Sequence, residues 1–282
     1  MSETASGQVW LVTGAGSGFG LAIAKAVLER GGRVVAAART LDRPALADLR
    51  EMGGHRVSLV QFDVTQSDEV QAGVDHAVSL FGGVDVVVNS AGRGSFGSSE
   101  ETPDAEVREL FEVNFFGSLN VIRAVLPVLR HQRSGHVVQI SSLAGVAPPA
   151  PGLASYSASK FAVEGFAEVL AKEVAHLGIG VTIVEPGDFR TGFGGALRVT
   201  PPTLPDYAAS VGRAAQTFAQ MEPAALGDPD RAAVAIVDAI TSGDAPLRLP
   251  LGKDAIDGIG SKLRGQLSDL QVWAAAGRNM SS

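Results

Sequence analysis

Short apolar runs alternate with longer amphipathic stretches along the first two thirds of the chain. The runs are rich in β-branched residues and stay apolar at successive positions, which is typical of strands buried on both faces. They predict strands at Val9–Val12, Arg33–Ala38, Val57–Phe62, Val84–Val88, His136–Ile140 and Val181–Val184. Between the runs, apolar positions recur every three or four residues. This second pattern predicts helices at Gly18–Arg30, at 67–81 with Ser67 as the N-cap, at about Pro103–Leu129, and at Ala154–Leu177.

Strands that are apolar on both faces and separated by helices predict a parallel sheet covered by helices on both sides. Right-handed crossovers make this an α/β fold, a Rossmann-like doubly wound sheet whose ligand crevice lies at the carboxyl ends of the strands. The 282 residues suffice for one such domain, and no internal repeat or low-complexity linker divides them. We therefore expect residues 1–282 to form a single Rossmann-fold domain.

The pattern changes after the sixth strand. Residues 188–227 are rich in Gly, Pro and Ala with scattered aromatic residues, which predicts either a substrate-binding lid or a disordered segment. Asp228 and Pro229 are typical of a helix start, and Pro246–Pro250 could form a last strand. Residues 254–276 repeat apolar side chains at three- and four-residue spacing, which predicts an amphipathic helix packed in the core or between subunits.

Composition narrows the function classes. The chain has no cysteine and a formal net charge of −7, which excludes disulfides and thiolate metal sites and gives no basic stripe for nucleic acid. The five histidines show no metal-ligand spacing, so we expect no metal site. The first residues lack the basic and apolar stretches of a signal peptide, and no run approaches the ~20 apolar residues of a membrane span. A cytoplasmic protein with a small-molecule substrate, and neither membrane nor nucleic acid as partner, is the resulting expectation.

A glycine-rich loop follows the first predicted strand. Its sequence fits T-G-x-x-x-G-x-G, with Gly14, Gly18 and Gly20 around Ser17 and Phe19. Glycines allow a sharp turn from strand to helix and let the backbone approach a pyrophosphate at the helix N-terminus. The position of the loop favours dinucleotide binding over a mere turn.

The end of the second strand indicates which dinucleotide. An NAD site usually has an acidic residue there for the adenosine ribose, whereas this strand runs Val34–Ala38 into Arg39. A guanidinium binds phosphate through forked hydrogen bonds, so NADP(H) is favoured over NAD(H). The alternative is that Arg39 is an ordinary solvated surface residue.

Tyr156 and Lys160 are four residues apart at the start of a predicted helix and therefore share one face. A phenol is a poor acid–base catalyst near neutrality, but an adjacent cation favours the phenolate and is expected to lower its pKa. Other segments should reach the same carboxyl edge of the sheet, and they contribute Asn89, Ala91, Gly92, Asn114, Ser141 and Ser142.

Together, these motifs and their order from about Val9 to Thr191 resemble those of a classical short-chain dehydrogenase/reductase. The resemblance implies that Tyr156 is the general acid/base, that Ser142 hydrogen-bonds the substrate oxygen, that Lys160 binds the nicotinamide ribose, and that Asn114 holds a water linking Lys160 to solvent. It also implies a set of cofactor contacts, which comprises Gly14, Ser17, Gly18, Phe19, Gly20, Arg39, Asp63, Val64, Asn89, Ala91, Gly92, Tyr156, Lys160, Pro186, Gly187 and Thr191. Members of the family are commonly homodimers or homotetramers.

Two features depart from the common family pattern. Ser142 lies fourteen residues before Tyr156, one more than is common, which leaves Ser141 as an alternative partner for the substrate oxygen. Ser17 occupies a position where many NADP-dependent members carry a base, so Arg39 would hold the extra phosphate largely alone.

Apolar residues near the expected site predict its substrate. Phe96, Leu143, Leu153 and Phe193 could line an apolar pocket, although packing of a lid would use the same residues. Asp188 and Arg190 could bind a polar group of the substrate or face solvent. The leading hypothesis is an NADP(H)-dependent oxidoreductase acting on an apolar, mid-sized ketone or secondary alcohol. The alternatives are an NAD-dependent dehydrogenase of the same family and a catalytically silent dinucleotide sensor.

Overall fold

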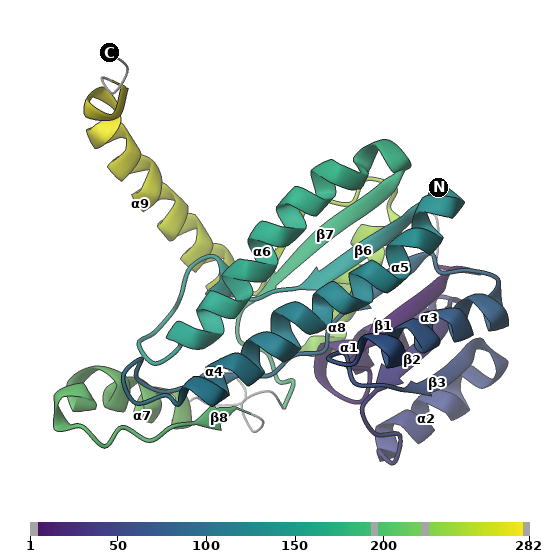
Figure 1. The fold of residues 1–282 in the computed structure, drawn as a ribbon, viewed down its shortest axis with the longest axis horizontal. Coiled ribbons are helices and arrows are strands. Elements are labelled where there is room, and N and C mark those ends of the chain that lie inside the picture. Colours follow the sequence, from purple (N-terminus) through teal and green to yellow (C-terminus); the bar gives the residue numbers. More distant parts are fainter. Residues whose placement is uncertain (1–4, 193–196, 221–225, 279–282) are drawn as a thin grey trace.

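The computed structural model describes residues 5–192, 197–220 and 226–278. Its centre is a seven-stranded sheet in the order β3-β2-β1-β4-β6-β7-β9, and every neighbouring pair is parallel (Figure 1). The strands are β1 (Val9–Thr13), β2 (Arg33–Ala38), β3 (Val57–Gln61), β4 (Val86–Asn89), β6 (Gly135–Ile140), β7 (Ile179–Pro186) and β9 (Arg248–Leu251). This confirms the predicted Rossmann-like, doubly wound α/β fold.

Helices cover both faces of the sheet. Apolar side chains of α1 (Gly18–Glu29), α2 (Pro44–Gly53) and α8 (Pro229–Thr241) share one core with alternate residues of the strands. Those of α3 (Ser67–Phe81), α5 (Ser118–Gln132) and α6 (Ala154–Val174) share a core on the other face. Strand β1 contributes to both, because Trp10 and Val12 point to the first core and Leu11 to the second. Burial on both faces explains why the strands are almost continuously apolar.

The order of the strands reverses between β1 and β4. The chain passes from β1 outward to β2 and β3, then crosses back to β4 on the opposite side of β1. The loops after β1 and β4 therefore diverge and leave a crevice at the carboxyl edge of the sheet, where doubly wound folds bind their ligands.

Several predicted boundaries need correction. The N-cap of α3 is Gln66, and Ser67 is the first helical residue rather than the cap. Helix α2, which begins at Pro44, was not predicted, because its apolar positions are sparse between charged residues. The fourth strand begins at Val86 rather than at residue 84, and the last strand lies at Arg248–Leu251.

The predicted helix 103–129 is interrupted. Helix α4 (Asp104–Phe111) passes into α5 through a π-helical turn at Glu112–Gly117, which contains Asn114. Such π-turns occur often at functional sites, since the extra residue shifts the register of the helix and displaces a side chain. The stretch Asp104–Gln132 is long and apolar enough to cross a membrane by length and composition, but it packs against the sheet as a core helix does.

The described parts of residues 188–227 are folded rather than disordered. They form β8 (Arg198–Val199), a 3-10 turn (Pro205–Tyr207), a π-helical turn (Ala208–Gly212) and α7 (Arg213–Ala219). Strand β8 pairs with β5 (Ser95–Phe96), which follows β4, so the segment is fastened beside the crevice. We refer to residues 197–220 below as the lid.

Helix α9 (Lys253–Arg278) ends the described chain and extends beyond the predicted 254–276 at both ends. It packs on the domain only near its start, where Ala255 and Ile259 are buried, and then projects away from the domain (Figure 1). The expectation of core packing therefore holds for its first two turns and not for the rest.

Candidate active site

The glycine loop lies against the loop that follows β4. Gly14 has a φ of +66°, and a Cβ added there would lie 2.9 Å from the backbone nitrogen of Ala91. A side chain would therefore push the two loops apart. The hydroxyl of Thr13 joins them, because it accepts hydrogen bonds from the backbone N–H groups of Ser90 and Ala91 at 3.1 and 3.2 Å.

The N-terminus of α1 has the properties of a phosphate site. Its N-cap, Ser17, makes no side-chain hydrogen bond to the first turn, and that turn contains no acidic residue. Backbone N–H groups at an uncapped helix start carry partial positive charge and can bind an anion. The residues at this end of the crevice therefore fit the pyrophosphate of a dinucleotide.

The loop after β7 closes over the same helix start. Phe189 packs edge-on against Phe19 with ring centroids 5.2 Å apart, and Thr191 lies beside Gly18. Thr191 is thus brought to the glycine loop, while Pro186 and Gly187 lie at the end of β7 that leads to it, with Gly187 against Asp254. Phe193 lies outside the described residues.

Two arginines, rather than one, flank the glycine loop on the side of β2. Arg39 directly follows β2, and its side chain is exposed. Arg43, at the start of α2, folds back so that its Cδ lies where a Cβ on Gly16 would clash, at 2.8 Å. Sequence reasoning missed Arg43, since only the turn between β2 and α2 brings it to the loop.

The residues predicted to contact adenosine follow β3 and β4. Asp63 accepts hydrogen bonds from the backbone and hydroxyl of Thr65 at 2.9 Å, and Val64 is buried against Gly117. Asn89 is buried and donates to the carbonyl of Ser118 and the side chain of Gln139, so it joins β4 to its neighbours. Gly92 lies beside both Asn114 and Lys160.

Tyr156 and Ser142 meet at the centre of the crevice. Tyr156 is 8% exposed, and its side chain is hydrogen-bonded to that of Ser142. Burial raises the pKa of Tyr156 to about 12, while the Ser142 hydrogen bond opposes the rise. The pKa is therefore raised rather than lowered as the neighbouring cation of Lys160 led us to expect, because burial removes water from around the phenolate.

The two serines after β6 have different surroundings. Ser142 is the N-cap of a short 3-10 turn, where its Oγ accepts a hydrogen bond from the N–H of Ala144 at 3.1 Å. Ser141 is buried, and its side chain interacts with the carboxyl group of Glu164. Of the two, Ser142 is the residue in contact with Tyr156.

Lys160 lies one turn further along α6 and is 6% exposed. Its Nζ donates a hydrogen bond to the carbonyl oxygen of Ile140 at 2.9 Å and lies 6.0 Å from the centroid of the Tyr156 ring. Burial lowers the pKa of Lys160 to about 8, although the carboxylate of Glu164 acts in the opposite direction. The lysine is therefore held in place by strand β6.

Asn114 is positioned by the π-helical turn. Its Oδ1 accepts from the N–H of Arg93 at 2.9 Å, and its Nδ2 donates to the carbonyl of Arg93 and to Ser159, both at 3.0 Å. Through these contacts one buried amide joins the loop after β4 to α6. The side chain thus orients the backbone around Lys160.

A buried cluster of charges lies behind Lys160, and sequence reasoning missed it. Arg248 on β9 forms ion pairs with Glu164, Glu168 and Glu185, of which Glu164 and Glu185 are almost fully buried. Burial raises the pKa of Glu164 to about 7, against the opposing effects of Ser141 and Arg248. Glu164 is four residues after Lys160, so the two share a helix face. The cluster could not be recognised from this spacing alone, because Glu185 and Arg248 come from β7 and β9.

The start of α9 contacts the loop after β7. The carboxylate of Asp254 accepts a hydrogen bond from the backbone N–H of Asp188 at 2.7 Å and occupies the space where Gly187 would carry a Cβ. Burial, and secondarily the charge of Asp254, raise the pKa of Asp188. Arg190 pairs instead with Asp228 at 3.6 Å, which places it away from this group.

The predicted pocket residues separate into two groups. Phe96 and Leu153 are buried in one apolar cluster with Tyr156 and Val211 of the lid. Leu143 packs in a different cluster with Ala255 and Ile259 of α9. An open pocket of about 650 Å³ lies between the 148–153 loop, α6 and the lid, but it borders the helix face opposite Tyr156.

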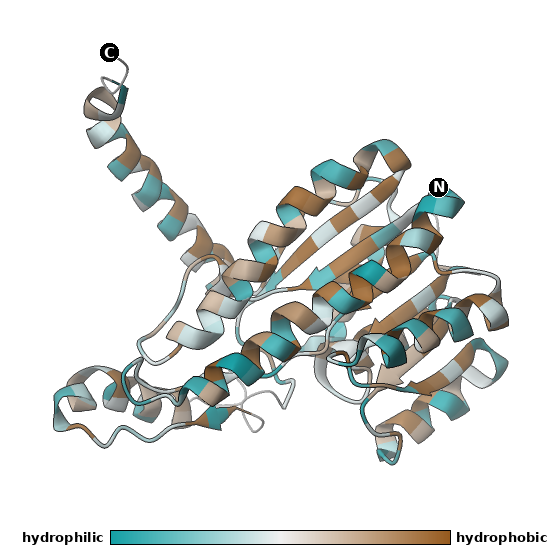
Figure 2. Ribbon diagram, in the orientation of Figure 1, coloured by the Kyte–Doolittle hydropathy of each residue, from teal (hydrophilic) through white to brown (hydrophobic). Residues whose placement is uncertain are grey.

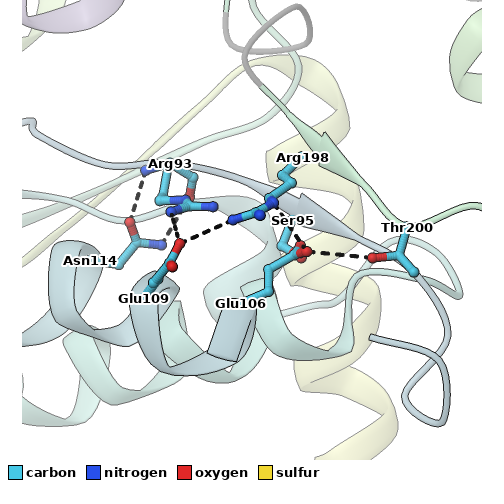
Figure 3. A network of polar contacts seen from close by, with 7 residues as sticks. All are labelled: Arg93, Ser95, Glu106, Glu109, Asn114, Arg198 and Thr200. Carbon is cyan, nitrogen blue, oxygen red and sulfur yellow. Dashed lines mark hydrogen bonds and ion pairs between the residues drawn. The ribbon is translucent and has the colours of Figure 1, made fainter. Parts of the chain in front are cut away.

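Charged residues fasten the lid to the rest of the domain (Figure 3). Glu106 is buried, accepts a hydrogen bond from Ser95 and pairs with Arg198 on β8 at 3.4 Å. Glu109 binds Arg93 and Arg198, at 3.1 and 3.0 Å. Because the backbone of Arg93 also contacts Asn114, the network connects the lid to the candidate site.

Comparison with known proteins identifies similar chains. A family model described as short chain dehydrogenase matches residues 8–201. A 3-ketodihydrosphingosine reductase from Bacteroides thetaiotaomicron is 37% identical over 247 residues, which cover 87% of this chain and 88% of that protein. The crystal structure of a short-chain dehydrogenase from Streptomyces avermitilis is similar with a TM-score of 0.89 and 42% identity, covering 97% of this chain and 100% of that one.

Two further similar structures were solved with different cofactors. A short-chain dehydrogenase/reductase from Burkholderia phymatum, in complex with NAD, is 27% identical with a TM-score of 0.81, covering 96% of each chain. An alcohol dehydrogenase from Thermococcus sibiricus, complexed with 5-hydroxy-NADP, is 26% identical with a TM-score of 0.71, covering 86% of this chain and 95% of that one. This fold therefore accommodates either dinucleotide.

Proposed function

This chain is a member of the short-chain dehydrogenase family, and from that premise we propose that it is an NADP(H)-dependent oxidoreductase acting on a ketone or secondary alcohol. The observation that carries the proposal is the buried contact between Ser142 and Tyr156 with Lys160 one helical turn away. A sensor that has lost its chemistry would not need these three groups together.

The chain's own residues supply proton transfer and charge stabilisation. The bound nicotinamide would supply or accept the hydride, which no side chain can do. When a carbonyl is reduced, negative charge grows on its oxygen, and the hydroxyls of Ser142 and Tyr156 stabilise it by hydrogen bonds. A pKa of about 12 keeps Tyr156 protonated at neutral pH, so the phenol is ready to donate its proton to that oxygen.

The remaining residues of the centre orient this pair. Lys160 would bind the nicotinamide ribose. Its hydrogen bond to the carbonyl oxygen of Ile140 fixes the position of its Nζ relative to the sheet. Asn114 holds the loop after β4 against α6, next to the place where a water would link Lys160 to solvent.

Preference for NADP(H) rests on two guanidinium groups. The carboxyl end of β2 carries Arg39 where an NAD site would place an acid, and Arg43 lies over Gly16. Together they can bind a 2′-phosphate on adenosine from two directions, and the uncapped start of α1 binds the pyrophosphate. Many NADP-dependent members carry a basic residue at the position of Ser17. In this chain we propose that Arg43 takes over that role.

The substrate is proposed to be an apolar, mid-sized ketone. Phe96 and Leu153 place an apolar surface beside Tyr156, and the lid covers it. The relative named 3-ketodihydrosphingosine reductase agrees with a ketone attached to a long apolar chain. Leu143 is better placed to hold α9 than to contact such a substrate.

The organisation of the protein completes the proposal. We take residues 1–282 as a single domain with residues 188–227 as its substrate-binding segment, and the protein as a cytoplasmic homodimer or homotetramer. The pairing of β8 with β5 supports the assignment of the lid to the same domain.

Parallel titration with NADPH and NADH, followed by the fluorescence of the reduced nicotinamide, tests the cofactor. Tighter binding of NADPH by tenfold or more is expected from a charged, bidentate phosphate contact. Equal or tighter binding of NADH would refute the preference while leaving the catalytic residues in place. Turnover of a ketone series at saturating cofactor tests the reaction, and no turnover of any ketone or secondary alcohol would refute it.

A further inference from the structure

Helix α9 leaves the domain with most of its length uncovered. Its 26 residues span about 39 Å, and of their side chains only Ala255 and Ile259 are buried. Four glycines weaken it as an isolated helix by about 0.5–1 kcal/mol each, and they are Gly258, Gly260, Gly265 and Gly277. A projecting helix of this composition gains much of its stability from packing against a partner.

Apolar residues recur along the uncovered part, where brown and teal segments alternate (Figure 2), and six positions fall on one stripe of the helix. The spacing alternates between four and three residues, and the members are Ile256, Gly260, Leu263, Leu267, Leu270 and Ala274. This is the a/d repeat of a coiled-coil seam, which keeps one face towards a second helix over several turns. Trp273 and Ile259 flank the stripe on one side.

The exposed area is large enough for a stable contact. Ile256, Leu263 and Leu267 are 57, 53 and 54% exposed, and Leu270 and Trp273 reach 66 and 70%. Together these five side chains expose on the order of 600 Å² per chain, so a symmetric pair would bury roughly 1,200 Å², within the range of specific interfaces.

The charge of the helix excludes strongly charged partners. Basic and acidic residues are nearly balanced along α9, and they are Lys253, Lys262, Arg264 and Arg278 against Asp254, Asp257 and Asp269. Nucleic acid and an anionic membrane surface both require a basic face, which this helix lacks. A partner with a similar neutral, heptad-spaced face is required.

The seam of α9 is itself complementary when two copies run antiparallel. In the register that overlaps the helices from end to end, Leu263 faces Leu267, Gly260 faces Leu270 and Ile256 faces Ala274. Each layer then pairs two leucines or one large with one small residue. A parallel pair would instead place glycine on glycine and alanine on alanine, leaving gaps beside the leucine layers.

We propose that α9 is a dimerisation arm that pairs antiparallel with α9 of a second copy of this chain. The same surface of each chain covers the other, so the contact is isologous. A third chain cannot add to it, and the contact is complete in a dimer. It is separate from the crevice, although the root of α9 contacts the loop after β7 through Asp254.

Cysteine cross-linking tests the arm directly, because the wild-type chain has no cysteine. The double variant Ile256→Cys/Ala274→Cys should form a disulfide-linked dimer on mild oxidation. Within one straight helix the two positions are about 27 Å apart, so no internal disulfide can form. Each single variant should stay uncross-linked. Absence of the dimer in the double variant, or cross-linking of either single variant, would overturn the proposal.

Mass measurement by light scattering gives an independent readout. Leu267→Asp/Leu270→Asp places charges in the seam and should halve the number of chains per particle. Ser268→Asp, outside the seam and about 100° from Leu267 around the helix, is the matched control and should leave the number unchanged. An unchanged number in the seam variant, with the circular dichroism of the folded domain retained, would overturn the proposal.

Discussion

The Nζ of Lys160 donates a hydrogen bond to the carbonyl oxygen of Ile140 and lies 6.0 Å from the ring centroid of Tyr156, one helical turn away on α6. The lysine is therefore fixed from the side of strand β6. Ser142 makes the hydrogen bond to the phenol. The proposed proton donor and the proposed ribose-binding lysine are thus held by different partners.

Tyr156→Phe should lower kcat by about a thousandfold, because it removes the group proposed to protonate the substrate oxygen and leaves only the hydrogen bond from Ser142. Binding of NADPH should change less than twofold, since the phenol is not part of the phosphate site. Tyr207→Phe is the matched control, because Tyr207 is the only other tyrosine. Its hydroxyl, in the lid, donates a hydrogen bond to Glu100 outside the lid. Steady-state kinetics with a ketone and fluorescence titration separate the two effects. Full activity of the Tyr156 variant would contradict the proposed role of Tyr156 as the proton donor.

Arg39→Ala and Arg43→Ala should each weaken NADPH binding by about tenfold while leaving NADH binding unchanged, because only NADPH carries the 2′-phosphate. The double variant should lose the preference altogether. Arg50→Ala on the exposed surface of α2 controls for the loss of general positive charge. Equal losses for NADPH and NADH would show instead that the arginines support the loop and do not bind the extra phosphate.

The strands and the crevice could be predicted from sequence because their signals are local. Runs such as Val34–Ala38 are apolar at every position only when both faces of a sheet are covered, and parallel strands place their following loops at one edge. For this reason Gly14, Asn89, Ser142 and Gly187 could be assigned to one site from their positions after four different strands.

The residues that sequence could not predict act through tertiary contacts. Arg43 reaches the glycine loop only through the turn into α2, and Arg248 meets Glu164 and Glu185 only once β9 is placed beside β7. The pKa of Tyr156 was predicted in the wrong direction, because spacing reveals a nearby cation but not the degree of burial. The stripe on α9 was correctly predicted as amphipathic, but periodicity cannot show whether the same chain covers it.

The lid should loosen when its buried anchor is lost. Glu106→Ala removes the acceptor for Ser95 and the partner of Arg198, and each charged hydrogen bond is worth about 1.5–3 kcal/mol when buried. We expect KM for a ketone to rise at least tenfold, with the Kd for NADPH unchanged. Glu112→Ala, at the exposed start of the π-helical turn that follows α4, is the control. A parallel rise in the NADPH Kd would indicate general damage to the domain and not a loosened lid.

Burial of Lys160 should make stability depend on pH. The folded chain releases this proton near pH 8, whereas the unfolded chain holds it to about 10.5, so the unfolded state binds more protons between these values. The free energy of unfolding should therefore rise with pH across that window, by up to about 3 kcal/mol from this group. Lys160→Met should remove the rise, and the exposed Lys172→Met on the same helix should retain it. Urea titrations at pH 8 and pH 10 measure the difference.

Glu164 should contribute the opposite slope at lower pH. Its pKa of about 7 in the folded chain exceeds the ordinary value of 4.5, so the folded state binds more protons between the two. The free energy of unfolding should then fall as pH rises from 4.5 to 7, by up to about 3 kcal/mol from this group. Glu164→Gln keeps the shape without the charge and should flatten this fall. The half-exposed Glu168→Gln, which loses a contact to the same Arg248, should not. Urea titrations at pH 5 and pH 8 measure the change in the free energy of unfolding. The same change in the Glu164 variant as in the wild type would mean that another group of the buried cluster takes up the proton.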